Sequence, residues 1–516
     1  MSLPEAYIIT FIASFCSLVI EMVAGRILAP FVGVSLYTWT SIIGIILAGI
    51  SIGAYIGGKL VDRYPRRITL ALLLLLSGVA ALTIIPLTNM VAAYHFPFSL
   101  MWRIFIVTAI IFFIPGCILG TISPVVVRLT LQSLNRAGNV IGKIYAFSTL
   151  GAIIGTFATG FLFISWMGTR NIIFTMGIVL ILAALVAGRL FKRKVIFASF
   201  LAVCGLSLLP LYIWAYKINL KYPAYYYKES DYYTIKLAKS KGRDGATPVE
   251  ALVLDHLIHS YVSLGNPLHI EYEYERIYGE VLKWMYKAES PFRSLSIGGG
   301  GYTFPRYMEL SYPRADIDVV EIDPEVTNAV YRYLGLPRDT RIRTFNTDGR
   351  WFVMNCTEKY DIILTDAFND LSIPYHLTTK EFLKQLDAIL SDNGVLMSNV
   401  IDNFQKGAFL PSYMRTLGEV FGPENVYLIS ISPDFKNLRI STFIVVATKG
   451  RRDMKKFDAW LKNKPDGRGK SVLVSDALKN ELLTNRQSIV MTDDYAPVDN
   501  LIAPIFEERF GYKGKR

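Results

Sequence analysis

The most constraining feature of this sequence is a series of long apolar stretches confined to its first 216 residues. Each has about the 20 residues that an α-helix needs to cross a hydrocarbon layer of about 30 Å. They predict seven membrane spans, at residues 7–29, 38–58, 68–88, 104–126, 143–166, 171–190 and 195–216. Glycines recur at four-residue spacing in several of them, as in GIILAGISIGAYIGG, which favours close helix packing. We therefore expect an α-helical membrane bundle over residues 1–216 and not a single anchor.

The formal net charge of +12 lies almost wholly in this apolar part. Through Tyr216 the sequence has 14 Lys and Arg against 3 acidic residues, whereas the remaining 300 residues have 40 against 39. Basic loops follow the second, fourth and sixth predicted spans, and the positive-inside tendency then places the N-terminus in the cytoplasm. This pattern indicates a multi-pass protein of the cell membrane, in contact with the lipid bilayer, and argues against a nucleic-acid partner.

Two polar features of the apolar part have a structural and a functional interpretation. Glu21 and Arg26 lie near the end of the first span, where charge is costly. They form either a structural ion pair or a polar site inside the bundle. The four cysteines are far apart and have no zinc or disulfide spacing, so no metal site is predicted.

The pattern changes after the last apolar stretch. Residues 217–270 are rich in tyrosine and alternate between apolar and polar residues, which predicts a small antiparallel β domain. Residues 271–516 alternate strand and helix signals, which predicts a Rossmann-like α/β domain with a mostly parallel sheet and helices on both faces. Ligands of such domains bind at the carboxyl ends of the strands.

Informative residues follow successive predicted strands of this domain. Gly298–Gly301 form a turn without Cβ atoms, so a ligand can approach its backbone and the N–H groups of the next helix. Glu321 ends the next strand, where it can accept both hydroxyls of a ribose. Asp348, beside Gly349, is suited to an adenine amino group. Taken singly, Glu321 is equally a surface acid and Asp348 a turn former, but in this order they indicate an adenosine site.

Two further acids follow the fourth strand of the series. In ILTDAFND, Asp366 and Asp370 lie where a reacting group would be placed. A carboxylate beside an attacking amine can orient the ammonium and accept its proton. An amine whose free pKa is near 10 needs this help.

Residues 229–405 resemble the spermidine synthase family of aminopropyltransferases. The resemblance rests on ESDYYTIKL, LVLDHLIHS, YERIYGE, IGGGG, VVEID, NTDGRWF and YDIILTDAFND, which follow that family's order and spacing. It implies a methyltransferase-type domain that transfers the aminopropyl group of decarboxylated S-adenosylmethionine to an amine and releases methylthioadenosine. The family needs no permanently bound cofactor, and some of its members carry a multi-span bundle. A homodimer is left open.

The resemblance also implies a role for each matching residue. The roles are catalysis for Asp366, Asp370 and Tyr278; binding of the donor for Gly298, Gly299, Gly300, Gly301, Glu321, Asp348 and Gly349; and binding of the amine for His259, Glu275 and Asn369.

Three departures from the family pattern concern substrate recognition. Gly301 stands where the family has an acid that pairs with the donor's amino group, and His259 replaces a glutamine. Asn369 stands at the second acid of the catalytic loop, with Asp370 one place later. The departures leave open whether the donor is decarboxylated or intact S-adenosylmethionine, and which amine accepts the group.

Alternatives therefore stay open. The domain could catalyse another S-adenosylmethionine-dependent transfer, such as methylation, or the chain could be a transporter or sensor that binds a nucleoside or polyamine without catalysis. His256, His259 and His376 form either a proton relay or hydrogen-bonded wall residues. Asp493 and Asp494 either close over the site or cap the last helix. Seven spans from a cytoplasmic N-terminus would place the α/β domain outside, whereas the donor is cytosolic, so the side of the membrane is also open.

Overall fold

The computed structural model describes residues 1–33, 35–93, 100–131, 136–189, 224–255, 257–367, 373–450, 452, 454–463, 471–484 and 488–510. These residues form two compact units. A helical unit contains residues 1–189 together with Glu229–Asp231, and an α/β unit contains residues 224–228 and 232–510. The division into domains at 1–216, 217–270 and 271–516 stays a prediction, because the chain around its first boundary lies outside the described residues.

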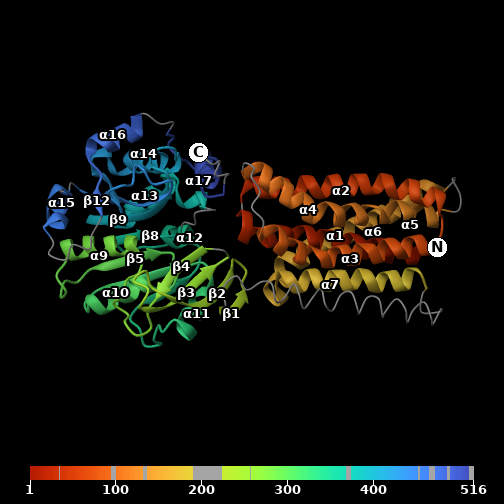
Figure 1. Cartoon of the computed structure of the whole chain (residues 1–516), viewed down its shortest axis with the longest axis horizontal. Helices are drawn as coiled ribbons and strands as arrows, with labels where there is room; N and C mark the ends of the chain where they lie inside the picture. The colour runs from red at the N-terminus through yellow and green to blue at the C-terminus, as the bar shows by residue number, and fades with distance from the viewer. Residues whose placement is uncertain are drawn as a thin grey trace. The chain divides into compact units, whose positions relative to one another are not determined.

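The helical unit is a bundle of long apolar helices (Figure 1). They are α1 (Leu3–Val32), α2 (Leu36–Arg63), α3 (Arg67–Ala93), α4 (Leu100–Gly120), α5 (Ile122–Thr130), α6 (Ala137–Ala158) and α7 (Ile164–Ala187), with a π-helical turn at Thr159–Phe163. Within the described residues, five continuous helical segments are long and apolar enough to cross a membrane, where the sequence predicts seven spans.

One of the two spans by which these numbers differ lies in the segment that contains Gly168. This fifth segment runs for 51 residues, from Ala137 to Ala187, and contains the predicted span 143–166 and most of the predicted span 171–190. As one straight helix it would be about 77 Å long, more than twice the thickness of the hydrocarbon layer. Gly168 interrupts it with non-helical angles of φ 72° and ψ 160°, and both α6 and α7 pack against α1. The predicted span 195–216 lies outside the described residues.

Glycines bring particular pairs of helices into backbone contact, as the four-residue spacing predicts. A Cβ on Gly53 of α2 would lie 1.9 Å from the carbonyl oxygen of Cys117 in α4, and one on Gly151 of α6 would lie 2.3 Å from that of Phe11 in α1. No side chain fits at these places, so the prediction of close packing is confirmed. Arg26 does not bind Glu21, because its guanidinium donates to the carbonyls of Ser230 and Asp231, which belong to the same unit.

The α/β unit begins with a four-stranded antiparallel sheet in the order β1-β2-β3-β4. Its strands are β1 (Ala224–Glu229), β2 (Thr234–Lys241), β3 (Pro248–Leu254) and β4 (Leu257–Val262). Alternate residues such as Ile235 and Leu237 are buried in the core that this sheet shares with the larger sheet. The predicted small β region is confirmed.

The larger sheet has eight strands in the order β12-β10-β11-β9-β8-β5-β6-β7. The strands are β5 (Arg293–Ile297), β6 (Asp316–Glu321), β7 (Arg343–Asn346), β8 (Tyr360–Thr365), β9 (Leu390–Asp402), β10 (Val426–Ser430), β11 (Ser441–Thr448) and β12 (Val472–Leu473). Strands β5 to β9 pair in parallel, and β10, β11 and β12 pair antiparallel at one side. Because β6 and β8 flank β5, the strand order reverses at β5, which is where such sheets bind ligands.

Helices cover both faces of this sheet (Figure 1), with α10 on one side and α13 and α14 on the other. The helices are α9 (Glu273–Met285), α10 (Thr303–Ser311), α11 (Pro324–Tyr333), α12 (Gly349–Met354), α13 (Lys380–Ile389), α14 (Phe409–Phe421), α15 (Met454–Lys462), α16 (Asp476–Thr484) and α17 (Val498–Phe510), with short 3₁₀ turns at Tyr375–Leu377 and Pro423–Asn425. Side chains of Asp323, Asp348 and Thr379 accept backbone N–H groups at the starts of α11, α12 and α13, which fixes where these helices begin.

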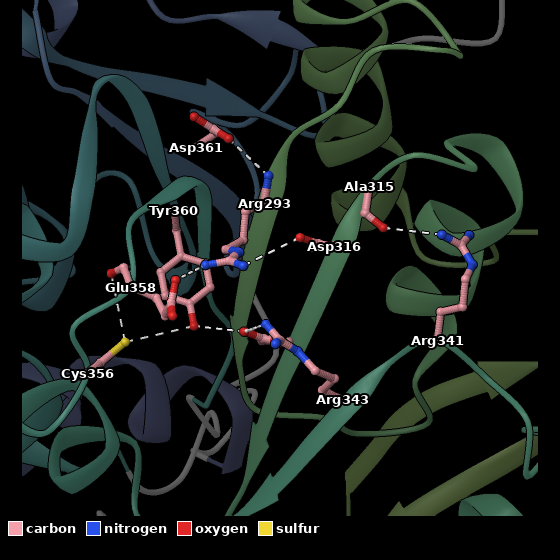
Figure 2. A network of polar contacts seen from close by, with 10 residues as sticks. Arg293, Ala315, Asp316, Arg341, Arg343, Cys356, Glu358, Tyr360 and Asp361 are labelled. Atoms are coloured by element: carbon pink, nitrogen blue, oxygen red, sulfur yellow. Dashed lines mark hydrogen bonds and ion pairs between the residues drawn. The ribbon is translucent and has the colours of Figure 1, made fainter.

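The amino-terminal end of the parallel strands is held by ion pairs (Figure 2). Arg343 donates two hydrogen bonds of 2.6 and 2.7 Å to Asp318, whose carboxylate also accepts the Tyr360 hydroxyl at 2.8 Å. Arg293 pairs with Glu358 and lies 3.5 Å from Asp316. Asp318 is 1% exposed, so the arginine and tyrosine stabilise a carboxylate that burial alone would destabilise.

Candidate active site

The carboxyl ends of β5, β6, β7 and β8 are level with one another. Ile297, the last residue of β5, pairs with Val320 of β6 and Thr365 of β8, and Glu321 pairs with Asn346 of β7. The residues that follow these positions therefore lie along one edge of the sheet. This edge brings together the glycine turn, Glu321, Asp348 and Asp366, as predicted from the strand order.

The glycine turn is held against both neighbouring strands. Gly298 has φ 99°, and a Cβ there would lie 2.5 Å from the carbonyl oxygen of Asp366. Its own N–H donates to Val320, and the N–H of Asp366 donates to Ile297. Only glycine can adopt this angle so close to another backbone, and the turn is thereby placed beside Asp366.

Glu321, the last residue of β6, binds the backbone of the glycine turn. Its carboxylate accepts the N–H of Gly299 at 2.9 Å and that of Asp323 at 3.0 Å, with a longer contact of 3.4 Å from Gly300. Burial raises the pKa of Glu321, although these backbone donors act in the opposite direction. The side chain is 6% exposed and lies next to the predicted donor site, as a ribose ligand would.

Asp348 is a helix cap as well as a predicted adenine ligand. One carboxylate oxygen accepts the N–H groups of Arg350 and Trp351, and the other lies 3.0 Å from Nε2 of His376. Partial burial would raise the pKa of Asp348, but hydrogen bonds from Trp351 and His376 outweigh it and the pKa is lowered. A Cβ on Gly349 would lie 2.6 Å from Ile297, so the helix start packs closely on the end of β5.

Asp366 follows β8 and is held by neutral donors. Tyr274 donates its hydroxyl to one oxygen at 2.9 Å, and the amide of Asn399 donates to the other at 2.9 Å. Burial raises the pKa of Asp366 to about 6, against the lowering effect of these two hydrogen bonds. Among the described residues, no basic side chain binds it. A base of this pKa is ionised at neutral pH and can still accept a proton.

Glu275 and Tyr278 lie on α9 next to this carboxylate. Burial, and then the charge of Asp366, raise the pKa of Glu275 well above its usual value. The same two causes raise the pKa of Tyr278, whose side chain is 1% exposed. The Tyr278 hydroxyl has no hydrogen-bond partner among the described residues. The site therefore offers a second carboxyl group and an unsatisfied hydroxyl beside Asp366.

His259 and Gly301 lie on the side of the turn that faces β4. Burial lowers the pKa of His259 to about 4, so the ring is neutral, and its Nε2 has no partner in the part of the chain that the structure describes. The N–H of Gly301 donates to the Ser260 hydroxyl at 2.8 Å. A Cβ on Gly301 would lie 2.7 Å from that of Ser260, so Ser260 occupies the space that an acidic side chain at residue 301 would need.

Several of the residues named from the sequence are not placed by the structure. Asn369, Asp370 and His256 lie outside the described residues. The other two histidines of the predicted relay have different neighbours, since His376 binds Asp348 and His259 packs near the ring of Tyr233. Within the described residues, no hydrogen bond joins these two histidines.

Three residues at this edge, Tyr274, Asn399 and Arg350, were not named from the sequence as part of the site. Tyr274 precedes Tyr278 by one helical turn, and this spacing was the available signal. Asn399 lies on β9, and nothing near it in the sequence indicates its approach to Asp366. Arg350 binds Asp493 through two hydrogen bonds of 2.7 and 2.5 Å. Asp493 also accepts the Thr379 hydroxyl at 2.7 Å, so it contacts the start of α13 and not the last helix.

The sheet order and its acid-rich carboxyl edge define a methyltransferase-like α/β domain. A family model described as the spermine/spermidine synthase domain matches residues 276–456. The resemblance predicted from the motifs is therefore confirmed over this part of the α/β unit.

Curated relatives match this chain in two ways. The polyamine aminopropyltransferase of Vibrio vulnificus is 37% identical over 135 residues, which cover 26% of this chain and 44% of that protein. The probable polyamine aminopropyl transferase of Bifidobacterium longum is 31% identical, and the match covers 31% of its length. The chain thus spans less than half of these two relatives. Polyamine aminopropyltransferase 2 of Aquifex aeolicus is 23% identical over 424 residues, covering 79% of this chain and 81% of that protein.

A solved structure also resembles the chain. The probable spermidine synthase from Corynebacterium glutamicum aligns with a TM-score of 0.44 at 22% identity, covering 52% of this chain and 96% of that one.

Proposed function

We propose that this chain is a membrane-integrated aminopropyltransferase that uses decarboxylated S-adenosylmethionine as donor and an amine as acceptor. The observation that carries the proposal is the position of Asp366, at the carboxyl end of β8 beside the glycine turn, with Glu275 nearby. The match of residues 276–456 to the spermine/spermidine synthase domain and the long apolar helices support it.

The chemistry requires an uncharged amine nitrogen. Asp366, ionised above a pKa of about 6, accepts a proton from the ammonium group. The nitrogen lone pair then attacks the methylene carbon bonded to the sulfonium sulfur. A C–N bond forms, the C–S bond breaks, and its electron pair neutralises the sulfur as methylthioadenosine leaves.

The surrounding residues place the reactants. Tyr274 and Asn399 fix the Asp366 carboxylate by donating to opposite oxygens, so it keeps one orientation toward the amine. Glu275 offers a second carboxyl group for the far end of a diamine. Glu321 binds the ribose and Asp348 the adenine, with His376 holding the Asp348 carboxylate.

Another transfer from S-adenosylmethionine is the second candidate. It is favoured by one observation, the filling of the space at Gly301 by Ser260, which removes the acid that a cationic donor tail would bind. A carboxylate-bearing tail does not need such an acid.

The test is product analysis with purified full-length protein in lipid nanodiscs. Decarboxylated S-adenosylmethionine plus a panel of diamines should yield methylthioadenosine and a longer amine, measured by mass spectrometry. Intact S-adenosylmethionine should yield no product. If instead only intact S-adenosylmethionine reacts and S-adenosylhomocysteine accumulates, the proposal is wrong and the second candidate holds.

A further inference from the structure

The helical unit contains an open pocket of about 680 Å³, within the range of small-molecule sites. Its wall is formed by α1, α2, α6 and the region where α4 ends and α5 begins. About half of the lining side chains are aliphatic, and hydroxyl groups lie among them. The pocket lies wholly within the helical unit and uses none of the residues at the edge of the α/β sheet.

The pocket lies between two helix pairs that glycines hold together. Gly151 and Gly155 of α6 contact the backbone of α1, and Gly53 and Gly57 of α2 contact the α4–α5 region. Both pairs contribute to the wall, for example through Ser148 of α6 and Gly58 of α2. The backbone contacts close each pair internally, so the remaining space lies where the pairs face one another.

The junction of α4 and α5 forms part of the wall. The apolar segment Met101–Thr130 is continuous through Thr121, which keeps helical angles of φ −68° and ψ −22° while its N–H donates to Ile118. Gly120 and Pro124, on either side of Thr121, both line the pocket.

Hydroxyl groups of the wall lack partners. Ser17 is 8% exposed, lines the pocket and has no hydrogen-bond partner among the described residues. Ser123 and Thr149 also line it and have no partner among the described residues, but they are exposed, and Ser14 and Ser148 bind each other at 2.6 Å. A buried hydroxyl without a partner, such as that of Ser17, is costly, and a hydrogen-bonding ligand would remove that cost.

The charges of the wall do not favour a polycation. Among the described lining residues Asp62 is the acidic one; it is exposed and lies 3.5 Å from Arg128, which lines the pocket too. Glu5, elsewhere in the bundle, is bound by Arg67 and Arg189. A polyamine would therefore meet no buried carboxylate here to balance its several positive charges.

We propose that this pocket is a binding site for an uncharged, hydrogen-bonding solute of nucleoside size. The hydroxyls of Ser17, Ser123 and Thr149 supply donors and acceptors, the aliphatic wall covers the apolar part of the ligand, and the ring of Tyr145 lies on the wall for a planar base. The choice of ligand rests on the proposed function, since methylthioadenosine is the uncharged nucleoside that the proposed reaction releases.

Two glycines of α2 provide a matched test. A Cβ on either Gly58 or Gly44 meets no atom within 4 Å, so both accept a side chain without strain, but only Gly58 lines the pocket. Labelled methylthioadenosine is titrated by equilibrium dialysis into full-length protein in nanodiscs. We expect two molecules per chain for the unchanged protein and for Gly44→Leu, and one for Gly58→Leu.

A second variant assigns the two molecules to their sites. Glu321→Gln should lose the molecule at the sheet edge and keep the one sensitive to Gly58→Leu. The proposal is overturned if Gly58→Leu keeps full stoichiometry, if labelled spermidine displaces the nucleoside from the Gly58-sensitive site, or if a copurified phospholipid occupies it. A single molecule that Gly58→Leu removes and Glu321→Gln leaves unchanged would support the pocket while contradicting the function proposed for the α/β unit.

Discussion

The two ends of the parallel sheet carry the same types of acidic residue with different partners. At the amino end, Asp318 is bound by Arg343 and Tyr360. At the carboxyl end, the buried Glu321 and the half-buried Asp366 have neutral donors only, among the described residues. Opposite charges stabilise the first arrangement, whereas the second retains a desolvation cost that a cationic or hydroxyl-bearing ligand can relieve. The comparison separates acids that hold the sheet from acids available for chemistry.

Replacing Asp366 by asparagine tests the carboxyl end of the strands and has the largest expected effect. The variant keeps the size of the side chain but cannot accept the amine proton, so kcat should fall by about 1,000-fold. Donor binding, followed by calorimetry with decarboxylated S-adenosylmethionine, should persist. Full activity in Asp366→Asn would contradict the assignment of the base.

The pH dependence of the reaction also tests whether Asp366 is the base. Burial raises the pKa of Asp366 from 3.8 to about 6, so kcat/KM should fall about tenfold per pH unit below pH 6 as the carboxylate is protonated. The effect on stability has the opposite sign. Between these two pKa values the folded state holds more protons than the unfolded state, so this group makes folding less favourable as pH rises through the window.

Asp366→Asn should therefore raise the free energy of unfolding above pH 6 and leave it unchanged near pH 4. Urea denaturation at the two pH values measures both. A variant that is destabilised at pH 8 would show that the carboxylate is compensated in the folded protein.

At the amino end of the strands we expect the reverse, a loss of stability without a loss of activity. Asp318→Asn removes a buried charge from Arg343 and should cost about 2 kcal/mol of stability, less than a fully buried pair because the Arg343 side chain is 50% exposed. The kcat value should not change. Glu358→Gln is the control, since that carboxylate is exposed and its loss should cost less than about 1 kcal/mol. A large loss of activity in Asp318→Asn would break the distinction between the two ends.

We expect a smaller effect, on KM for the donor, at the ion pair between Arg350 and Asp493 near the carboxyl end of the strands. Arg350 raises the stability of the Asp493 carboxylate and holds the pKa of that group below its usual value. Asp493→Asn should weaken the support of α12 and raise KM for the donor about threefold with kcat unchanged. The neighbouring Asp494→Asn, which removes no ion pair, should leave both parameters as they are. Equal effects of the two variants would count against a positioning role for Asp493.

Sequence reasoning identified the residues that directly follow strands and missed those brought in from a distance. Gly298, Glu321 and Asp348 could be named because a parallel sheet places successive strand ends at one edge. Asn399 could not, because its approach to Asp366 depends on the pairing of β8 with β9, whose register no local pattern states. Asp493 reaches Arg350 across 143 residues of sequence, and its acidic type is equally consistent with a helix cap.

The membrane helices show a similar limit. Hydropathy located the apolar stretches, but the helices extend beyond them, as in α1, which spans 30 residues. Polar ends continue a helix without contributing to the signal. Glycine spacing indicated that helices approach closely, but it contains no information about which helix is the partner.

The glycines of α2 also limit how this helix can move. Gly49, Gly53 and Gly57 each lie against a backbone carbonyl of α4 or of the residue after it, those of Phe113, Cys117 and Thr121. These glycines are spaced by four residues, or about 6 Å along the helix. A displacement of α2 along α4 by less than this spacing would press larger residues against those carbonyls. α2 can therefore slide along α4 only by multiples of this spacing, and any smaller motion must move α2 and α4 together.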